Sequence, residues 1–186
     1  MTVLPVIALV AAYVATIPLA NWMVQHVGTV CVADGPCLLP VWPGILAPSG
    51  VALAGLALVL RDLVQRRAGL VWSLAAIGVG VAVSALLAPP ALVAGSAMAF
   101  LVSELADAAV YTPLQRRGLV VAVLASSAVG AVVDSVVFLR LAFGSLEHVE
   151  GQIIGKLWAI GAAVALIGLV RRRESAGPRG SGGYAA

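Results

Sequence analysis

The sequence predicts an all-α integral membrane protein: one bundle of six transmembrane helices with both termini in the cytoplasm. Of the 186 residues, 62% are hydrophobic and only 10% are charged, and the mean hydropathy is +1.09. Soluble domains are far less apolar and carry more charge. Six apolar stretches of roughly membrane-spanning length are separated by short polar segments. The basic residues of these segments fall in alternate loops, which is the pattern of a multi-pass membrane protein.

Each of the six stretches has recognisable ends. No basic segment precedes the first one, so we interpret it as a retained span and not as a signal peptide. Pro89 and Pro90 end the third, because proline cannot continue a helix. We treat residues 1–173 as one transmembrane domain, and we expect the Gly- and Ser-rich residues 174–186 to be a disordered cytoplasmic tail. The expected spans are about 3–24, 45–62, 69–87, 91–111, 119–143 and 152–170.

The distribution of arginine predicts the orientation. With six spans, the arginines at the ends of the second, fourth and sixth spans all lie on one side of the membrane. The loops on the opposite side have none. The positive-inside rule places that side in the cytoplasm of a plasma (inner) membrane protein. Basic residues in short loops suit anionic lipid better than nucleic acid, so we expect a lipid bilayer as partner and no nucleic acid. The arginines counted are Arg61, Arg66, Arg67, Arg116, Arg117 and Arg171 to Arg173.

Two cysteines, Cys31 and Cys37, lie in a polar loop that this topology places outside the cytoplasm, where a disulfide persists. A disulfide and two free thiols are both compatible with the spacing. A metal site is not expected, because no histidine or second cysteine pair stands at ligand spacing. A nucleotide-binding loop is missing from the sequence, and we expect no cofactor.

The fourth stretch contains two carboxylates, Glu104 and Asp107, where a membrane helix normally has none. At 100° per residue, Tyr111 falls about 20° from Glu104 and about 40° from Asp107, so the three share one stripe. A charge near mid-bilayer costs roughly 2.5–3.5 kcal/mol on insertion scales and normally faces the bundle interior or a wet cavity. The stripe therefore predicts a binding site, although acids hydrogen-bonded to a neighbouring helix are an alternative.

Three further charged residues lie within spans: Asp134, Arg140 and Lys156. Asp134 is ~13 Å and Lys156 ~7 Å below the outer ends of their spans, which predicts an ion pair between them. The pair would be either part of the site or purely architectural. With three acids and two bases, at least one acid is left unpaired, as a proton carrier or a ligand contact.

Other polar and aromatic residues complete the candidate site. Gln152 lies one turn before Lys156, and Ser127 and Phe138 share the stripe of Asp134. We assign substrate binding to Glu104, Asp107, Tyr111, Asp134, Gln152 and Lys156, and a structural or secondary role to Asn21, Ser127, Phe138, Arg140 and Trp158. Arg140 is expected to extend to the lipid head groups, and Trp158 to lie in the interfacial aromatic belt.

The chain resembles a known family of membrane proteins. Residues 99–111, with Glu104, Asp107 and Tyr111, look like the fourth-span pattern of the VUT family, the putative vitamin uptake transporters regarded as queuosine precursor transporters. Residues 129–138 look like its Asp-Ser/Thr-x-x-Phe signature, and Lys156 fits its sixth-span lysine. The first half departs from the family, because Arg66 stands where a glutamate is frequent.

The resemblance implies import of a 7-deazaguanine, such as 7-cyano-7-deazaguanine or its aminomethyl relative. We therefore expect a transporter of a small purine-like molecule, not an enzyme. A substrate-binding subunit of an energy-coupling-factor-type vitamin importer, which needs ATPase partners, is an alternative. An intramembrane enzyme using Glu104 and Asp107 is less favoured, because no nucleophile with a base lies in the same spans. A homo-oligomer is left open.

Overall fold

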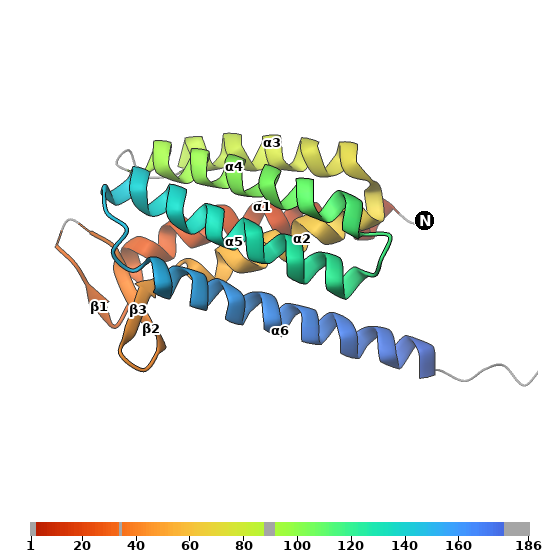
Figure 1. Ribbon diagram of the computed structural model, residues 1–186. Helices are drawn as coiled ribbons and strands as arrows, with labels where there is room; N and C mark the ends of the chain where they lie inside the picture. Colours follow the sequence, from red (N-terminus) through yellow and green to blue (C-terminus); the bar gives the residue numbers. More distant parts are fainter. Residues whose placement is uncertain (1–2, 34, 88–91, 177–186) are drawn as a thin grey trace, which may run out of the picture.

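The computed structural model describes residues 3–33, 35–87 and 92–176, and side chains between residues 6 and 169 of these ranges. This part of the chain forms six helices and a small antiparallel sheet (Figure 1). The helices are α1 (Val3–His26), α2 (Val51–Ala68), α3 (Leu70–Leu87), α4 (Val93–Leu114), α5 (Leu119–Phe143) and α6 (Val149–Ala176). The strands are β1 (Val30–Cys31), β2 (Cys37–Trp42) and β3 (Ile45–Pro48).

The helices run alternately up and down the bundle. The sheet and the α5–α6 connection lie at one end, while the α2–α3 and α4–α5 connections lie at the other (Figure 1). The start of α1 is also at this second end. We call the two ends the sheet end and the arginine end, because Arg66, Arg67, Arg116 and Arg117 lie at the second. The two arginine-containing connections thus lie at the end opposite the sheet and the α5–α6 connection (Figure 1).

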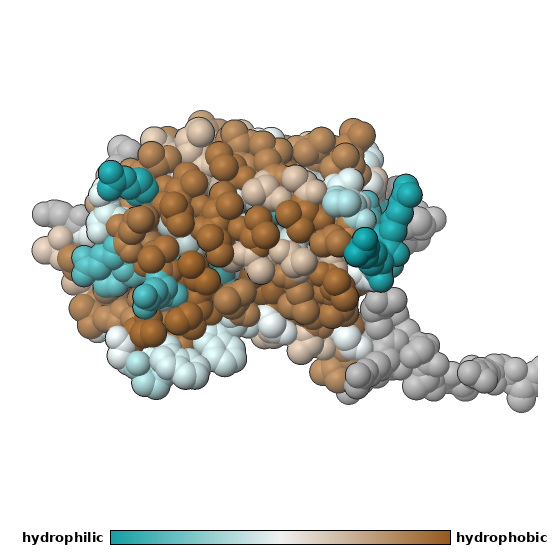
Figure 2. Space-filling view, in the orientation of Figure 1, coloured by the Kyte–Doolittle hydropathy of each residue, from teal (hydrophilic) through white to brown (hydrophobic). Residues whose placement is uncertain are grey.

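Large apolar side chains cover the outside of the bundle. Among the described residues, five helices are long and apolar enough to cross a membrane: α1, α3, α4, α5 and α6. Figure 2 shows a broad hydrophobic band over the middle of one face, with hydrophilic groups toward both ends. In water such a surface would be strongly unfavourable, whereas lipid solvates it. The outward-facing side chains include Val71, Trp72, Leu86, Leu166 and Leu169.

The remaining helix, α2, is central. It contacts all five other helices, and its apolar content is lower because Arg61, Asp62, Arg66 and Arg67 lie in its second half. Arg61 and Asp62 are fully buried. A helix surrounded by other helices can carry charge where a lipid-facing helix cannot, since its polar groups find partners inside the protein.

The sheet was not expected from the sequence. Residues 45–48 were predicted to begin the second span, but they form β3, which pairs with β2, and the helix starts only at Val51. The reason is the turn at Pro43 and Gly44, where Gly44 has a φ of 77° and the chain folds back on itself. Cys31 and Cys37 face each other across β1 and β2 and form a disulfide.

Other helix bounds also differ from the expected ones. The last helix begins at Val149 and continues to Ala176, so residues 174–176 are helical and not part of a disordered tail. Helix α4 ends at Leu114, three residues later than expected. The bounds of α5 coincide with those expected for the fifth span. Residues 88–91, which include the Pro89-Pro90 pair, and 177–186 lie outside the described residues.

Candidate functional site

A cavity lies between the helices in the half of the bundle nearest the sheet end. All six helices contribute to its wall, and the empty space along this wall, including open space outside the mouth, is about 650 Å³. It extends from Val24, Val51 and Gln152 near the sheet down to Leu58 and Glu104 midway along the bundle. Apolar side chains form most of the wall, and a few polar groups project from it, as in small-molecule sites. The polar wall residues are Thr16, Asn21, Ser84, Ser96, Ser103, Glu104, Asp134 and Gln152.

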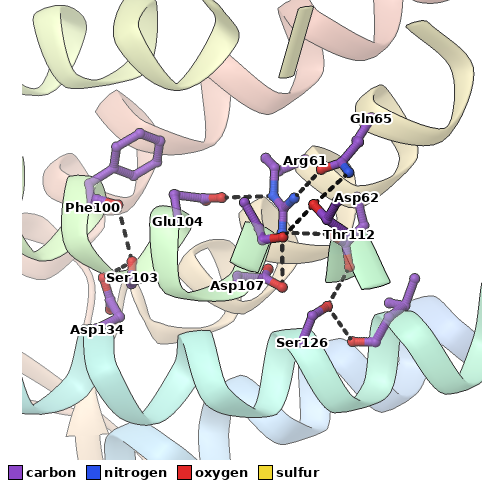
Figure 3. A network of polar contacts seen from close by, with 12 residues as sticks. Arg61, Asp62, Gln65, Phe100, Ser103, Glu104, Asp107, Thr112, Ser126 and Asp134 are labelled. Carbon is purple, nitrogen blue, oxygen red and sulfur yellow. Dashed lines mark hydrogen bonds and ion pairs between the residues drawn. The ribbon is translucent and has the colours of Figure 1, made fainter. Parts of the chain in front are cut away.

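Glu104 links this cavity to a group of buried charges deeper in the bundle. Its Oε2 lies 3.3 Å from Nε of Arg61. Nη2 of the same guanidinium lies 2.6 Å from Oδ1 of Asp62 and 2.9 Å from Oδ1 of Asp107 (Figure 3). All four side chains are at most 1% exposed. We call Arg61, Asp62, Glu104 and Asp107 the Arg61 cluster.

Neutral groups hold the Arg61 cluster in place. Arg61 Nη1 donates to Gln65 Oε1 at 2.8 Å, and Gln65 Nε2 donates to Thr112 Oγ1 at 3.1 Å. On the other side, Ser126 Oγ of α5 donates to Asp62 Oδ2 at 2.8 Å. The ring of Tyr111 lies against the guanidinium, 5.5 Å from centroid to Cζ. The cluster therefore ties α2, α4 and α5 together beneath the cavity (Figure 3).

The central position of Arg61 corrects two expectations. We had counted it with the basic residues of the loop at the arginine end, but its side chain is completely buried in the bundle. Glu104 and Asp107, expected to include an unpaired acid, both contact it. The excess of acid nevertheless persists, because one guanidinium faces three carboxylates. If all three carboxylates were ionised, two of their negative charges would have no compensating positive charge. That would cost much free energy in a buried site.

A second ion pair, between a fully buried lysine and a partly buried aspartate, joins α5 and α6 beside the cavity. Lys156 Nζ lies 2.7 Å from Asp134 Oδ2, which confirms the predicted pair. The ammonium also donates to Ser135 Oγ at 2.7 Å and to Gln152 Oε1 at 2.6 Å. Its three protons are thus matched by three acceptors. We call Asp134, Ser135, Gln152 and Lys156 the Lys156 cluster.

Close backbone packing fixes both clusters. A Cβ added to Gly55 of α2 would lie 2.7 Å from the carbonyl oxygen of Lys156, so only glycine allows α2 and α6 to approach this closely. A Cβ on Gly130 of α5 would lie 2.8 Å from a methyl group of Leu58 and 3.1 Å from Cβ of Asp107. Small residues on α2 and α5 therefore place the charged side chains at short range.

The structure separates the predicted site residues into groups. Glu104, Asp134 and Gln152 border the cavity, as do Asn21 and Phe138. Asp107 and Tyr111 share the stripe of Glu104, as expected, but lie in or against the Arg61 cluster. Lys156 does not line the cavity, but its ammonium contacts Asp134 and Gln152, which do. Ser127 is buried away from the cavity wall.

Two of the predicted secondary residues lie at the outside of the bundle. Arg140 is exposed and donates to the carbonyl oxygen of Gly144 at 3.0 Å, near the sheet end. Trp158 is also exposed, and its ring stacks on that of Trp42 from β2, with 6.2 Å between centroids. Neither position contacts the cavity or a buried cluster, which fits the interfacial placement expected for both.

Sequence reasoning missed three members of the site on α2: Arg61, Asp62 and Gln65. Arg61 and Gln65 are four residues apart, so they share one helix face. The signal that could have found them was the charge balance. Two acids on a lipid-embedded helix call for a cation in another span, and Arg61 is the arginine nearest the apolar part of the second span.

Comparison with known proteins identifies a family for this chain. No curated protein and no solved structure gave a significant match. A family model described as "Putative vitamin uptake transporter" matches residues 50–170. That range covers most of the chain, from the start of α2 to the last apolar turns of α6, and it includes both buried clusters. The chain therefore belongs to the family of putative vitamin uptake transporters.

Proposed function

We propose that this protein imports a 7-deazaguanine, a precursor of queuosine, across the plasma membrane. Membership of the transporter family and the five long apolar helices support a multi-pass membrane transporter of a vitamin-like compound. The choice of 7-deazaguanine rests on the chemistry of the cavity and on the motif resemblance around Glu104 and Asp134.

The observation that carries the proposal is a buried carboxylate, that of Glu104, at the deep end of the cavity. A 7-deazaguanine presents a ring N–H beside an exocyclic amine. One carboxylate accepts both in two parallel hydrogen bonds. Phe100 and Phe138 border the same cavity and offer aromatic surface to a flat bicyclic ring. Asp134 provides a second acceptor on the α5 side.

The Arg61 cluster gives Glu104 a way to change partners. When the carboxylate turns to a ligand, Arg61 retains Asp62 and Asp107 at 2.6 and 2.9 Å. The cation is then never left without a partner, so the exchange avoids the cost of an isolated buried charge. The cluster also closes the cavity toward the arginine end. Release on that side would require α2 and α4 to separate at these contacts, in an alternating-access cycle.

We propose that all six helices span the membrane, with the arginine end in the cytoplasm. The arginines at the α2–α3 and α4–α5 connections support this orientation through the positive-inside rule. The disulfide between Cys31 and Cys37 lies at the opposite end, which suits an oxidising compartment outside the cytoplasm. Helix α2 crosses as the central helix, shielded from lipid by the other five.

The experiment uses cells that cannot make the precursor and lack their own importer. They are given 7-cyano-7-deazaguanine, and queuosine in tRNA is measured with the parent protein and with Glu104→Gln, Asp107→Asn and Asp134→Asn. We expect queuosine with the parent and loss with Glu104→Gln and Asp134→Asn. Glu147→Gln, the same change at an exposed acid of the α5–α6 connection, is the matched control and should retain uptake. Absence of queuosine with the parent present in the membrane would contradict the proposed substrate.

A further inference from the structure

Tyr13 of α1 is a buried tyrosine with a free hydroxyl group. Its side chain is 0% exposed, and the hydroxyl oxygen has no hydrogen-bond partner among the described residues. The ring itself is well fixed, because it packs with Ala57 of α2 and Ala76 of α3, and its centroid lies 5.8 Å from that of Phe100. A buried tyrosine hydroxyl usually has a partner, so the free hydroxyl of Tyr13 needs an explanation.

The hydroxyl of Tyr13 lies beside the carboxylate of Glu104. Phe100 and Glu104 are one turn apart on α4 and share a helix face. The tyrosine ring that packs on Phe100 therefore brings its hydroxyl next to Glu104, although the two groups are not in hydrogen-bonding geometry. Tyr13 is not part of the cavity wall, whereas Glu104 is. An effect of this hydroxyl on a ligand would pass through Glu104.

Two other hydroxyl groups at this depth of the cavity are already used. Ser103, next to Glu104 on the cavity wall, donates to a backbone carbonyl of its own helix at 3.2 Å and lies 3.4 Å from Asp134 Oδ1. Thr16 donates to the carbonyl oxygen of Tyr13 at 2.6 Å. Of these three hydroxyl groups, that of Tyr13 is the one whose proton has no acceptor among the described residues.

Glu104 is the least tightly held carboxylate of the Arg61 cluster. Its Oε2 lies 3.3 Å from Arg61 Nε, the longest of the three ion-pair contacts, and neither atom makes a hydrogen bond within the described part of the chain. A carboxylate that turns from Arg61 to a ligand loses this contact. Since an ionised carboxylate has about four acceptor positions, it can accept the two donors of a ring edge and one further hydrogen bond.

We propose that Tyr13 is a positioning residue for Glu104: its hydroxyl donates to the carboxylate when Glu104 binds a ligand, in place of the contact with Arg61. This inference rests on the proposed function and adds a residue that holds its site in the ligand-bound state. The packing of the ring on three other helices gives the hydroxyl a fixed place. A hydrogen bond from it would orient the carboxylate and stabilise the ionised form that accepts from the ligand.

The test separates this role from a purely structural one. The dissociation constant of 7-cyano-7-deazaguanine is measured by calorimetry with the purified full-length protein in detergent, and the unfolding temperature is measured without ligand. Tyr13→Phe keeps the ring and removes only the hydroxyl. Ser73→Ala is the matched control, because the Ser73 hydroxyl on α3 is equally buried and has no partner among the described residues, but Ser73 does not border the cavity.

We expect Tyr13→Phe to bind the ligand about tenfold to a hundredfold more weakly than the parent, the range of one hydrogen bond to a charged group. Its unfolding temperature without ligand should not fall, because the lost hydroxyl makes no hydrogen bond in that state. Ser73→Ala should bind like the parent. The infrared difference spectrum between ligand-bound and ligand-free parent should contain a shifted tyrosine C–O band, and Tyr13→Phe should lack it.

Three results would overturn the role of Tyr13. They are parent-like affinity in Tyr13→Phe, an equal loss of affinity in Ser73→Ala, and a difference spectrum that Tyr13→Phe leaves unchanged. A loss of affinity together with a lower unfolding temperature of ligand-free Tyr13→Phe would make the residue structural, and this too would contradict the proposal. Absence of binding to the folded parent would overturn the proposed function and, with it, this role.

Discussion

The two buried ion clusters differ in how their cations are matched. Lys156 has one carboxylate, Asp134, and two neutral acceptors, so the cluster carries no net charge and each ammonium proton has its own partner. Arg61 has three carboxylates around one guanidinium. The first cluster is complete as it stands, whereas the second has more acid than its cation can neutralise.

This difference separates an architectural contact from an exchangeable one. Removing any member of the Lys156 cluster leaves a buried group unmatched, which makes the cluster suited to locking α5 against α6. In the Arg61 cluster, one carboxylate can leave while two remain. Glu104 is the member that also borders the cavity, so it is the carboxylate available to a ligand. The predictions below test this contrast, beginning with the largest expected effect.

Arg61→Gln should have the strongest consequence. The change leaves three carboxylates in the bundle centre without a cation, and removing one partner of a buried ion pair typically costs about 3–5 kcal/mol. We expect transport at background level and a large fall in the thermal unfolding temperature of the purified protein. Arg67→Gln, on the exposed part of the same helix, should alter neither. Parent-like transport by Arg61→Gln would show that the guanidinium is not needed.

Substitutions in the Lys156 cluster should lower the stability of the protein more than they hinder the exchange of Glu104 between Arg61 and the ligand. Lys156→Met leaves Asp134, whose side chain is 18% exposed, without its cation, and it should destabilise the protein by less than the about 3–5 kcal/mol typical of a fully buried pair. The double variant Lys156→Met, Asp134→Leu removes both charges and should recover most of the loss in unfolding temperature. A double variant no more stable than the single one would mean that the pair is not the unit of stabilisation.

The acid excess of the Arg61 cluster predicts coupling to protons. A proton that neutralises one of the three carboxylates would compensate charge each time Glu104 changes partner. Collapse of the proton gradient should therefore reduce uptake of 7-cyano-7-deazaguanine severalfold in cells expressing the parent. Valinomycin-treated cells, in which the electrical potential alone is removed, separate the two components. Uptake that is insensitive to loss of the pH gradient would refute proton coupling.

Substitution of Arg140 should have the smallest effect, because this residue belongs to neither cluster. Its guanidinium is exposed and bonds only the carbonyl oxygen of Gly144 among the described groups. Surface substitutions of this kind usually change stability by about 0.5 kcal/mol or less. Arg140→Gln should thus weaken uptake only slightly and leave the unfolding temperature near that of the parent. A severe loss would place a third cation in the mechanism.

Much of this architecture was accessible from the sequence. Apolar length predicted helices at nearly the right positions, since α1, α3 and α5 begin and end within two residues of the expected bounds. The Asp134–Lys156 pair followed from depth along the spans, because both residues lie on long, regular helices where 1.5 Å per residue is a good ruler. Two residues of the family motifs, Glu104 and Asp134, border the cavity.

Tertiary contacts account for what the sequence did not show. Arg61 looked like a loop residue because it precedes Arg66 and Arg67, and only the central position of α2 explains its burial. The strand at residues 45–48 is as apolar as the start of a span, and its pairing with β2 decides the structure. The hydrogen bond from Ser96 to Asn21 joins residues 75 positions apart, and no local pattern encodes it.

The most direct test of the account is uptake of labelled 7-cyano-7-deazaguanine into proteoliposomes that contain only this protein. The parent, Glu104→Gln and Glu147→Gln are compared at equal reconstituted amounts. We predict accumulation by the parent and by Glu147→Gln, and none by Glu104→Gln, because the amide no longer accepts both donors of the ring edge. Equal accumulation by the parent and Glu104→Gln would contradict the assignment of Glu104 as the ligand-binding carboxylate.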